Sequence, residues 1–401
     1  MTKKSDAPAI RFKGFSDAWE QRKFEDVGTV AMCKRIFKEQ TSEEGEVPFY
    51  KIGTFGGIPD AYITRELFEE YKKNYQYPNK GDILISASGS IGRTVEYTGK
   101  DEYYQDSNIV WLKHENDLDN SFLKVLYGVI EWSCEGSTIK RLYNDNFLKT
   151  EFMLPKIEEQ IKIGEYFSKL DHLITLHQRK FEKLTNVKKS MLEKMFPQNG
   201  SSYPEIRFKG FTDPWEQRKL GDIADIVGGG TPSTGNQSYW DGDIDWYAPA
   251  EIANQIYANS SQKKITGLGY ENSSAKMLPP GTVLFTSRAG IGKTAILTRK
   301  GCTNQGFQSI VPHRGALDSY FIFSRTGELK RYGELVGAGS TFVEVSGKQM
   351  AAMELMMPPT MREQQTIGGF FQQLDHLITL HQRELEKLQN IKKSMLEKMF
   401  V

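Results

Sequence analysis

LDHLITLHQRKFEKLTNVKKSMLEKMF occupies residues 170–196 and returns, with 23 of 27 positions identical, as LDHLITLHQRELEKLQNIKKSMLEKMF at residues 374–400. A second block, IRFKGFSDAWEQRKF at residues 10–24, returns as IRFKGFTDPWEQRKL at residues 206–220, with 12 of 15 positions identical. The offsets of the two pairs, 204 and 196 residues, are each about half of the 401-residue chain. The chain therefore consists of two related halves.

The residues between these blocks diverge strongly. They keep only short similarities, such as GDILISASGSIGRT at residues 81–94 against GTVLFTSRAGIGKT at residues 281–294. Each half thus combines a variable domain with a nearly invariant segment. This pattern is expected when the segment has a common task and each domain has an individual one.

The invariant segments are predicted to be long amphipathic helices. Apolar residues recur every three or four positions in residues 170–196, which contain neither Gly nor Pro. The helices are expected to begin just after Pro155 and Pro359, and the first is expected to end at Pro197. A helix of about 40 residues would be roughly 60 Å long.

Helices of this length need a partner for their apolar side. We expect the two copies to pack as an antiparallel two-stranded coiled coil, because the polar linker PQNGSSYPE at residues 197–205 lets the second half reverse direction. The remaining apolar positions are expected to face something else. They include four methionines: Met191, Met195, Met395 and Met399.

The variable domains are predicted to be α+β. They combine short strand-like runs at residues 82–86, 107–112, 282–286 and 308–311 with Gly-rich turns and few strong helices. Their six tryptophans are expected to be mostly core or docking residues rather than base-stacking residues. The predicted parts are a disordered tail (1–9), a first variable domain (10–155), a helix (156–196), a linker (197–205), a second variable domain (206–358) and a second helix (359–401).

Composition narrows the class of protein. With 52 basic and 51 acidic residues the net charge is +1, so the charge of the whole chain does not indicate a nucleic-acid or membrane partner. The mean hydropathy is −0.51 and no run approaches the roughly 20 apolar residues that span a bilayer, so we expect a soluble protein. The start, MTKKSDAPAI, lacks the apolar region of a secretory signal. The widely separated Cys33, Cys134 and Cys302 suit free buried thiols in a reducing cytoplasm.

Familiar catalytic and cofactor motifs are missing from the sequence. GIGKT at residues 290–294 ends like a phosphate-binding P-loop, but the required opening glycine would stand at the position of Ser287. Two interpretations stay open: a glycine turn that presents NH groups and side chains to a polyanion, or a plain surface hairpin. The paired helix histidines are five residues apart, about 140° around a helix, which does not suit a shared metal. We predict no catalytic and no metal-binding residue.

Local charge indicates a polyanion partner. Residues 272–317 contain six bases and no acid: Lys276, Arg288, Lys293, Arg299, Lys300 and Arg314. This stretch is also rich in the Gln, Asn, Ser and Thr that contact base edges, so DNA is favoured over a solvated surface. The loops GGGTPST (228–234), GSTFVEVSGK (339–348) and GSTIKRLY (136–143) add further candidates. The candidate DNA-binding residues are Lys34, Arg35, Ser90, Arg93, Thr94, Lys140, Arg141, Thr231, Ser233, Thr234, Arg288, Lys293, Thr294, Thr341 and Lys348.

At these residues the chain resembles the specificity subunits of type I restriction–modification systems. The resemblance covers nearly the whole chain and includes the P-x-x-x-E-Q sequence at the entry to each long helix, at residues 155–160 and 359–364. It departs from the family pattern in the first domain, where GTVAMCK at residues 28–34 stands in place of an evident GGGTPST loop.

The resemblance implies two target-recognition domains on an antiparallel helical spacer, each recognising one half of a bipartite, asymmetric site in double-stranded DNA. It also implies partners: two methyltransferase subunits, which bring S-adenosylmethionine, and two motor-nuclease restriction subunits, which use ATP and magnesium. This chain would hold no cofactor and would not be an enzyme. The positions expected in the coiled coil or in methyltransferase docking are Leu170, Ile174, Leu184, Met191, Leu374, Ile378, Leu388 and Met395.

Two alternatives come from other classes of protein. A duplicated scaffold could bind a protein or a glycan, in which case binding to duplex DNA would not fall steeply with salt. A self-sufficient DNA methyltransferase would need a cofactor loop that the sequence does not show, and the purified chain would transfer methyl groups alone.

Overall fold

The computed structural model describes residues 8–136, 140–198, 200–252, 255–288, 290–337 and 344–400. The chain forms two compact units, unit 1 with Met1–Gln178 and Arg383–Val401 and unit 2 with Arg179–Gln382. Each unit therefore combines one variable domain with part of each long helix. Most of the predicted N-terminal tail, at residues 1–7, lies outside the described residues.

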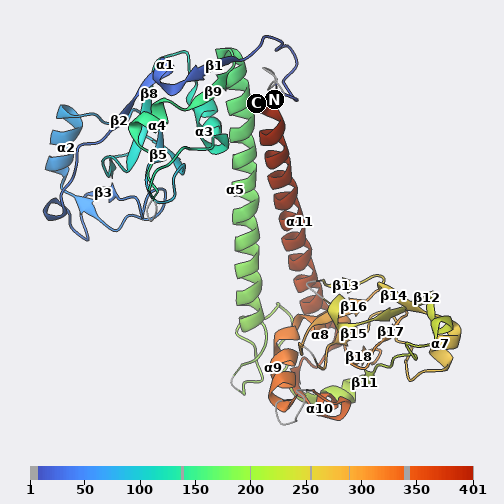
Figure 1. Ribbon diagram of the computed structural model, residues 1–401. Coiled ribbons are helices and arrows are strands. Elements are labelled where there is room, and N and C mark those ends of the chain that lie inside the picture. Colours follow the sequence, from blue (N-terminus) through green and yellow to red (C-terminus); the bar gives the residue numbers. More distant parts are fainter. Residues whose placement is uncertain are drawn as a thin grey trace. The chain divides into compact units, whose positions relative to one another are not determined.

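The two long helices are present, and their bounds lie within two residues of the predicted ranges 156–196 and 359–401. Helix α5 spans Ile157–Lys194 and α11 spans Met361–Met399, and both begin two residues after a proline, at Pro155 and Pro359 (Figure 1). Neither segment contains an internal proline to interrupt the helical hydrogen bonds.

The described residues of unit 1 form an α+β domain with three sheets. Its strands form the orders β2-β8-β5-β6, β4-β3-β7 and β1-β9. The strands are β1 (Glu20–Lys23), β2 (Gly28–Met32), β3 (Val47–Tyr50), β4 (Tyr62–Ile63), β5 (Ile83–Ser86), β6 (Thr94–Glu96), β7 (Tyr103–Tyr104), β8 (Ile109–His114) and β9 (Glu151–Leu154). Its shorter helices are α1 (Phe24–Val27), α2 (Arg65–Asn74), α3 (Asn120–Val129) and α4 (Asn144–Leu148), with a 3-10 turn at Lys38–Gln40.

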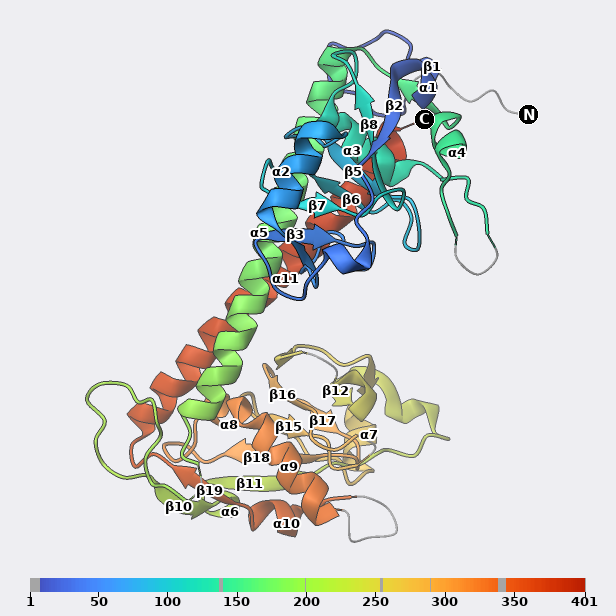
Figure 2. The ribbon, with the colours of Figure 1, turned by 90° about the vertical axis from the view of Figure 1, so that its left-hand side faces the viewer.

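Unit 2 repeats this plan with one added strand. Its orders are β11-β18-β15-β16-β13, β14-β12-β17 and β10-β19, and α8 lies against β15 and β16 (Figure 2). The strands are β10 (Glu216–Lys219), β11 (Ala224–Gly228), β12 (Trp240–Tyr247), β13 (Tyr257–Ala258), β14 (Lys263–Ile265), β15 (Val283–Phe285), β16 (Thr294–Leu297), β17 (Cys302–Thr303), β18 (Gln308–Pro312) and β19 (Glu354–Met357). Its helices are α6 (Leu220–Ile223), α7 (Gly267–Glu271), α8 (Ser319–Ser324), α9 (Thr326–Gly337) and α10 (Gly347–Ala351), with 3-10 turns at Gln237–Tyr239 and Pro249–Glu251.

The four predicted strands correspond to β5, β8, β15 and β18, which form the centre of the larger sheets. Their apolar residues are buried because the sheets are covered: Leu84 pairs with Trp111 and Val283 with Ile310, and all four side chains are in the core. Four of the six tryptophans are also buried, as expected for core residues: Trp19, Trp111, Trp215 and Trp246.

The helices run antiparallel within each unit. In unit 1, Asp171 of α5 pairs with Lys392 of α11 at 2.5 Å, and the earlier Phe167 contacts the later Phe400. In unit 2, Lys188 of α5 pairs with Asp375 of α11 at 2.5 Å, and the later Phe196 contacts the earlier Phe371. The predicted antiparallel pairing is confirmed in both units.

The last turn of each long helix packs into a domain core. In unit 2, Met195 and Phe196 are buried beside Trp215. In unit 1, Met399 is buried and Phe400 stacks on Phe122 with ring centroids 5.9 Å apart. The end of α5 therefore completes the core of the second domain, and the end of α11 completes that of the first. The methionines expected to face something other than the opposite helix face these domains.

The P-x-x-x-E-Q sequence anchors each helix to its own domain. In unit 1, buried Glu159 accepts two hydrogen bonds from Arg11, at 2.6 and 2.8 Å, and one from Trp19 Nε1 at 3.1 Å. The Gln160 side chain accepts from Asp119 N at 2.9 Å and donates to Asp117 O at 3.0 Å. These bonds fix the start of α5 against the start of α3.

Unit 2 repeats the anchor. Glu363 accepts from Arg207 at 2.8 and 2.9 Å and from Trp215 Nε1 at 3.2 Å, and Gln364 accepts from Asp318 N at 3.0 Å. The hydrogen bond to the carboxylate raises the pKa of the Arg207 guanidinium. The Arg and the Trp belong to the first repeated block and the Glu to the P-x-x-x-E-Q sequence, so both halves preserve this anchor.

Glycines let the helices approach closely. A Cβ at Gly164 would lie 1.9 Å from Ser121 Oγ, and one at Gly368 would lie 2.6 Å from Asp318 Oδ1. Only glycine fits these two positions without moving the domain away from the helix.

Candidate nucleic-acid interface

The repeated hairpins carry GSIGRT and AGIGKT on the same framework. In unit 1, Ser86 Oγ donates to Ser90 O at 2.5 Å and accepts from Arg93 N at 2.9 Å. In unit 2, Thr286 Oγ1 donates to Gly290 O at 2.7 Å and accepts from Lys293 N at 2.9 Å. The hydroxyl closes each turn, and positive φ angles at the glycines, such as 86° at Gly92, suit the tight reversal.

In unit 1 the predicted residues meet around the turn at residues 105–108, between β7 and β8. Arg35 Nε donates to Asp106 Oδ2 at 2.8 Å, and Arg141 donates to Ser107 Oγ at 2.7 Å. Two loops that are about a hundred residues apart in the sequence therefore reach the same turn.

Two more loops reach turn 105–108. Ser88 Oγ donates to Asn108 Oδ1 at 2.8 Å, and Gln105 Oε1 accepts from Ile52 N at 2.8 Å. Arg93 donates to Ile52 O at 2.6 Å, which ties the hairpin to the same group. Lys34 is exposed, with its ammonium 5.0 Å from the centroid of the Tyr75 ring.

In unit 2 the equivalent turn, residues 304–306 between β17 and β18, gathers the GGGTPST loop. Thr231 Oγ1 donates to Gln305 Oε1 at 2.5 Å, and Gly230 N donates to Thr303 O at 2.8 Å. A Cβ at Gly229 would lie 1.9 Å from Asn304 O, so the glycine allows this close approach.

The AGIGKT hairpin also reaches turn 304–306, and the strand-like segment before α10 pairs with the hairpin. Ser287 N donates to Gly306 O at 2.8 Å, and Val345 N donates to Ser287 O at 3.0 Å. The backbones of Arg288 and Glu344 form an isolated antiparallel β-bridge. Polar and basic loops thus converge on one turn in each unit.

Strand register supplies the missing counterpart of GGGTPST in the first domain. Met32, the last residue of β2, pairs with Val110, and Gly228, the last residue of β11, pairs with Gln308. Since Val110 and Gln308 occupy equivalent positions in β8 and β18, residues 32–38 correspond to residues 228–234. Lys34 and Arg35 therefore lie where the second domain has Gly230 and Thr231.

The other candidate residues differ in exposure. Lys140, Ser233, Thr234, Lys293 and Lys348 are exposed, Lys348 on α10, and Thr94 is half-buried on β6. Thr294 is buried and its hydroxyl lies 2.7 Å from that of Thr326, so DNA contact by this side chain would require β16 to shift. Thr341 lies outside the described residues.

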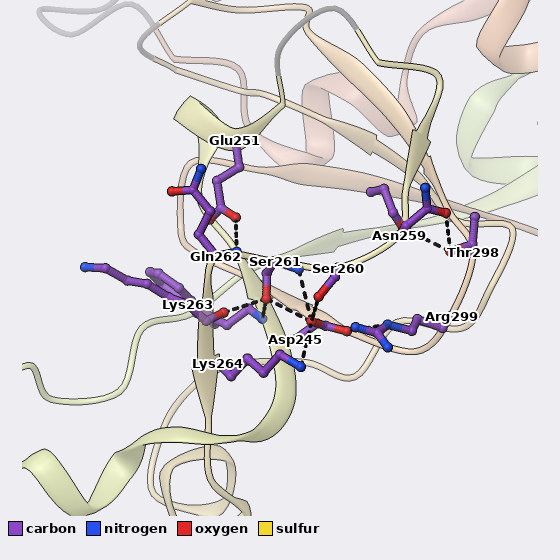
Figure 3. A network of polar contacts seen from close by, with 12 residues as sticks. Asp245, Glu251, Asn259, Ser260, Ser261, Gln262, Lys263, Lys264, Thr298 and Arg299 are labelled. Carbon is purple, nitrogen blue, oxygen red and sulfur yellow. Dashed lines mark hydrogen bonds and ion pairs between the residues drawn. The ribbon is translucent and has the colours of Figure 1, made fainter.

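One base of the acid-free stretch at residues 272–317 forms an ion pair with an aspartate outside that stretch. Arg299 binds Asp245 at 2.6 Å, and Lys264 lies 3.8 Å from the same carboxylate (Figure 3). Burial acts to raise the pKa of Asp245, but hydrogen bonds from Ser261 and the charges of Arg299 and Lys264 outweigh it, and the pKa lies below its ordinary value. Arg299 thus holds a loop in place and is less available to DNA than Lys276, Lys300 and Arg314, which are exposed.

Sequence reasoning missed the residues of the two turns themselves: Gln105, Asp106, Ser107, Asn108, Asn304 and Gln305. A signal was present, because both turns place amides and short polar residues directly before a buried strand.

Eight helix residues were expected in the coiled coil or in methyltransferase docking, and they are buried or half-buried within the units. Leu170 and Leu374 are buried, and Leu184, Met191, Leu388 and Met395 are half-buried against the two cores. Ile174 and Ile378 are half-buried as well.

The cysteines are free thiols. Burial raises the pKa of Cys33 to about 12 and that of Cys302 to about 11, so both thiols are protonated at neutral pH. Cys134 is only half-buried, in contrast to the expectation that all three are buried.

No group of three or more His, Cys, Asp or Glu in the described ranges could hold a metal ion. No helix in the described part of the chain is long and apolar enough to cross a membrane.

Comparison with known families agrees with the duplication. A family model described as the type I restriction modification DNA specificity domain matches residues 16–186 and again residues 212–390. The chain belongs to this family. Its two matched segments each cover one variable domain and most of one long helix.

Curated relatives carry the same description. The putative type I restriction enzyme specificity subunit S.HindORF215P of Haemophilus influenzae is 55% identical over 150 residues, which are 37% of this chain and 39% of that protein. The MjaIX specificity subunit of Methanocaldococcus jannaschii is 35% identical over 47% of this chain and 44% of its own length. The chain thus spans less than half the length of these two relatives. The putative MjaX specificity subunit of the same organism is 26% identical over 94% of this chain and 92% of its length.

A solved structure shows the same fold. The crystal structure of a type I restriction–modification S subunit from M. genitalium matches with a TM-score of 0.64 at 14% sequence identity, covering 98% of this chain and 99% of that one. This likeness bears on architecture alone.

Proposed function

We propose that this chain is the DNA-binding specificity subunit of a type I restriction–modification complex, and that it directs the modification and restriction subunits to a bipartite, asymmetric DNA site. The observation that carries the proposal is the convergence of polar and basic loops on one turn in each unit, at residues 105–108 and 304–306. Membership of the specificity-domain family supports it.

The two interfaces have the same framework and different side chains. Turn 105–108 reads QDSN and is met by Arg35 and Arg141, whereas turn 304–306 reads NQG and is met by Thr231. Amides, hydroxyls and guanidinium groups are the side chains that contact base edges. Different side chains on one framework would recognise two different half-sites.

The partners follow from the family resemblance. We infer two methyltransferase subunits, which supply S-adenosylmethionine and act on an adenine in each half-site, and two restriction subunits, which use ATP and magnesium. This chain would itself be non-catalytic. It would work in the cytoplasm, which contains the DNA and is reducing enough to keep its thiols free.

Modified-adenine sequencing tests the proposal. The chain is co-expressed with its methyltransferase subunit in cells that otherwise lack adenine methylation, with each protein expressed alone as a control. We expect one bipartite methylated motif with a fixed gap in the co-expressing cells and no motif in either control. Co-expressing cells without any motif would contradict the proposal, and methylation by this chain alone would show that it is an enzyme.

A further inference from the structure

An isolated antiparallel β-bridge, in which two backbone segments pair at a single position, occurs at the same place in both interfaces. In unit 1 it joins Ser88 to Arg141, and in unit 2 it joins Arg288 to Glu344. Neighbouring backbone bonds establish the equivalence, because Leu142 N donates to Ala87 O at 2.8 Å and Val345 N donates to Ser287 O at 3.0 Å. Position 88 therefore corresponds to 288, and position 141 corresponds to 344.

Each bridge carries one arginine, but on opposite sides. Unit 1 has its arginine on the segment after α3, at Arg141, and unit 2 has it on the hairpin, at Arg288. At each of the two equivalent positions, the residue differs between the first and the second half of the chain. A guanidinium group at the bridge is kept although the two domains have otherwise diverged.

Both arginines lie beside the turns on which the loops converge. Arg141 donates to Ser107 Oγ at 2.7 Å, and its neighbour across the bridge, Ser88, donates to Asn108. Arg288 lies next to turn 304–306, since a Cβ at Gly306 would be 3.6 Å from Arg288 Cγ.

The existing partners leave these guanidinium groups available. Arg288 Nη1 is 4.0 Å from Glu344 Oε2, and the two side chains are 44% and 39% exposed. An ion pair this long and this exposed contributes little, so exchange for a ligand costs little. Among the described residues, the guanidinium group of Arg141 donates one hydrogen bond, to a neutral hydroxyl, which leaves its other donors for a ligand.

We propose that Arg141 and Arg288 are specificity-determining residues that each recognise a guanine in one half-site. This inference rests on the proposed function. The planar fork of a guanidinium group matches O6 and N7 of guanine in the major groove. In unit 2, Glu344 stands beside Arg288 and can accept from the N4 amino group of the paired cytosine, so this bridge fits a complete G·C pair.

Arg93 and Lys293 provide matched controls. They occupy equivalent positions on the two hairpins, both are exposed, and they keep a positive charge while the chemical group changes from guanidinium to ammonium. A conserved charge on a changing group suits a phosphate contact, which positions the protein without selecting a base.

The test maps methylated adenines in cells that carry the methyltransferase subunit and one of four variants: Arg141→Gln, Arg288→Gln, Arg93→Gln or Lys293→Gln. We expect Arg141→Gln to relax or change one G·C position in one half-site and Arg288→Gln to do so in the other half-site. Discrimination at that position should fall roughly 5- to 150-fold, the range that one bidentate contact supplies. The control variants Arg93→Gln and Lys293→Gln should keep the motif and lower the methylated fraction across it.

Different outcomes would contradict the roles of the two arginines and the proposed function. A wild-type motif that stays unchanged in Arg141→Gln and Arg288→Gln would overturn the assignment of the arginines and leave the proposed function standing. Loss of discrimination at the same position in Arg93→Gln or Lys293→Gln would also overturn it. The absence of any motif with the wild-type chain would instead contradict the proposed function.

Discussion

Glu159 and Glu363 are buried carboxylates whose charge is matched by an arginine and a tryptophan NH. Each accepts from three donors, and their relative exposures are 2% and 1%. A buried ion pair is costly to break because the remaining charge loses its partner. These side chains therefore control how firmly each domain is held to its helix.

Replacing Glu363 should destabilise unit 2 strongly. Glu363→Ala leaves Arg207 and the Trp215 NH without their acceptor, and we expect a loss of about 3–5 kcal/mol in the free energy of unfolding. The measurement is urea unfolding followed by tryptophan fluorescence. Gln365→Ala, at an exposed neighbouring position, is the control. Equal midpoints for the two variants would show that the anchor does not stabilise the unit.

Asp245 should make the stability of unit 2 sensitive to acid. Its pKa is lower in the folded protein than in the unfolded chain, so its stabilising contribution is present above the unfolded value of about 3.9 and is lost as the pH falls through the folded pKa. Between pH 5 and pH 3, we expect the urea midpoint to fall more steeply for the wild type than for Asp245→Asn. Asp243→Asn, an exposed aspartate on the same strand, should follow the wild type. Parallel pH profiles for wild type and Asp245→Asn would contradict this role.

For individual residues, charge in the sequence singled out loops that the structure brings together, but it did not predict all of their contacts. Arg35, Arg93 and Arg141 were singled out by charge, and all three reach the group of contacts at turn 105–108. Burial of Thr294 and the pairing of Arg299 with Asp245 depend on contacts between distant segments. Such contacts have no local signature in one sequence.

The paired helices carry the same ion pair in two environments. Asp171 and Asp375 are equivalent in the repeat and bind Lys392 and Lys188, but the aspartate side chains are 46% and 9% exposed. Asp375 also accepts from Tyr320 OH at 2.9 Å. The two equivalent aspartates therefore allow the same ion pair to be compared in an exposed and in a buried environment.

Removing these aspartates should have unequal effects. Asp375→Ala leaves a buried tyrosine hydroxyl unpaired as well as the lysine, so we expect a loss of roughly 1–3 kcal/mol. Asp171→Ala breaks an exposed pair, and we expect a loss of at most about 1 kcal/mol. Chemical unfolding of both variants checks the order. A larger loss for Asp171→Ala would contradict the burial argument.

At the element scale, local periodicity predicted α5 and α11 almost to their ends. Apolar spacing and flanking prolines are local signals, and they were sufficient. The docking of Met195 and Phe196 in the second domain was not predictable, because the receiving surface is built from residues up to about two hundred positions away. The counterpart of GGGTPST was hidden for a similar reason, since only the pairing of β2 with β8 reveals it.

The whole molecule is linked through two continuous helices, each shared between the units. Under the proposed function, their length sets the gap between the half-sites. Inserting four residues after Gln178 and four after Gln382 adds one turn to each helix and keeps their pairing, which lengthens the pair by about 6 Å. We expect the non-specific gap to grow by roughly two base pairs with both half-sequences unchanged. Mapping of methylated adenines gives the gap directly, and a constant gap would show that the helices do not set it.

Under the proposed function, recognition of each half-site by one variable domain is independent of the other domain. The most direct test of this independence exchanges residues 206–358 for the corresponding domain of a relative with a different target, and maps methylated adenines in cells that carry the methyltransferase subunit. We expect one half-sequence to change while the other half-sequence and the gap are kept, and we expect exchange of residues 10–155 to change the opposite half. A change of both half-sequences after a single exchange would contradict it.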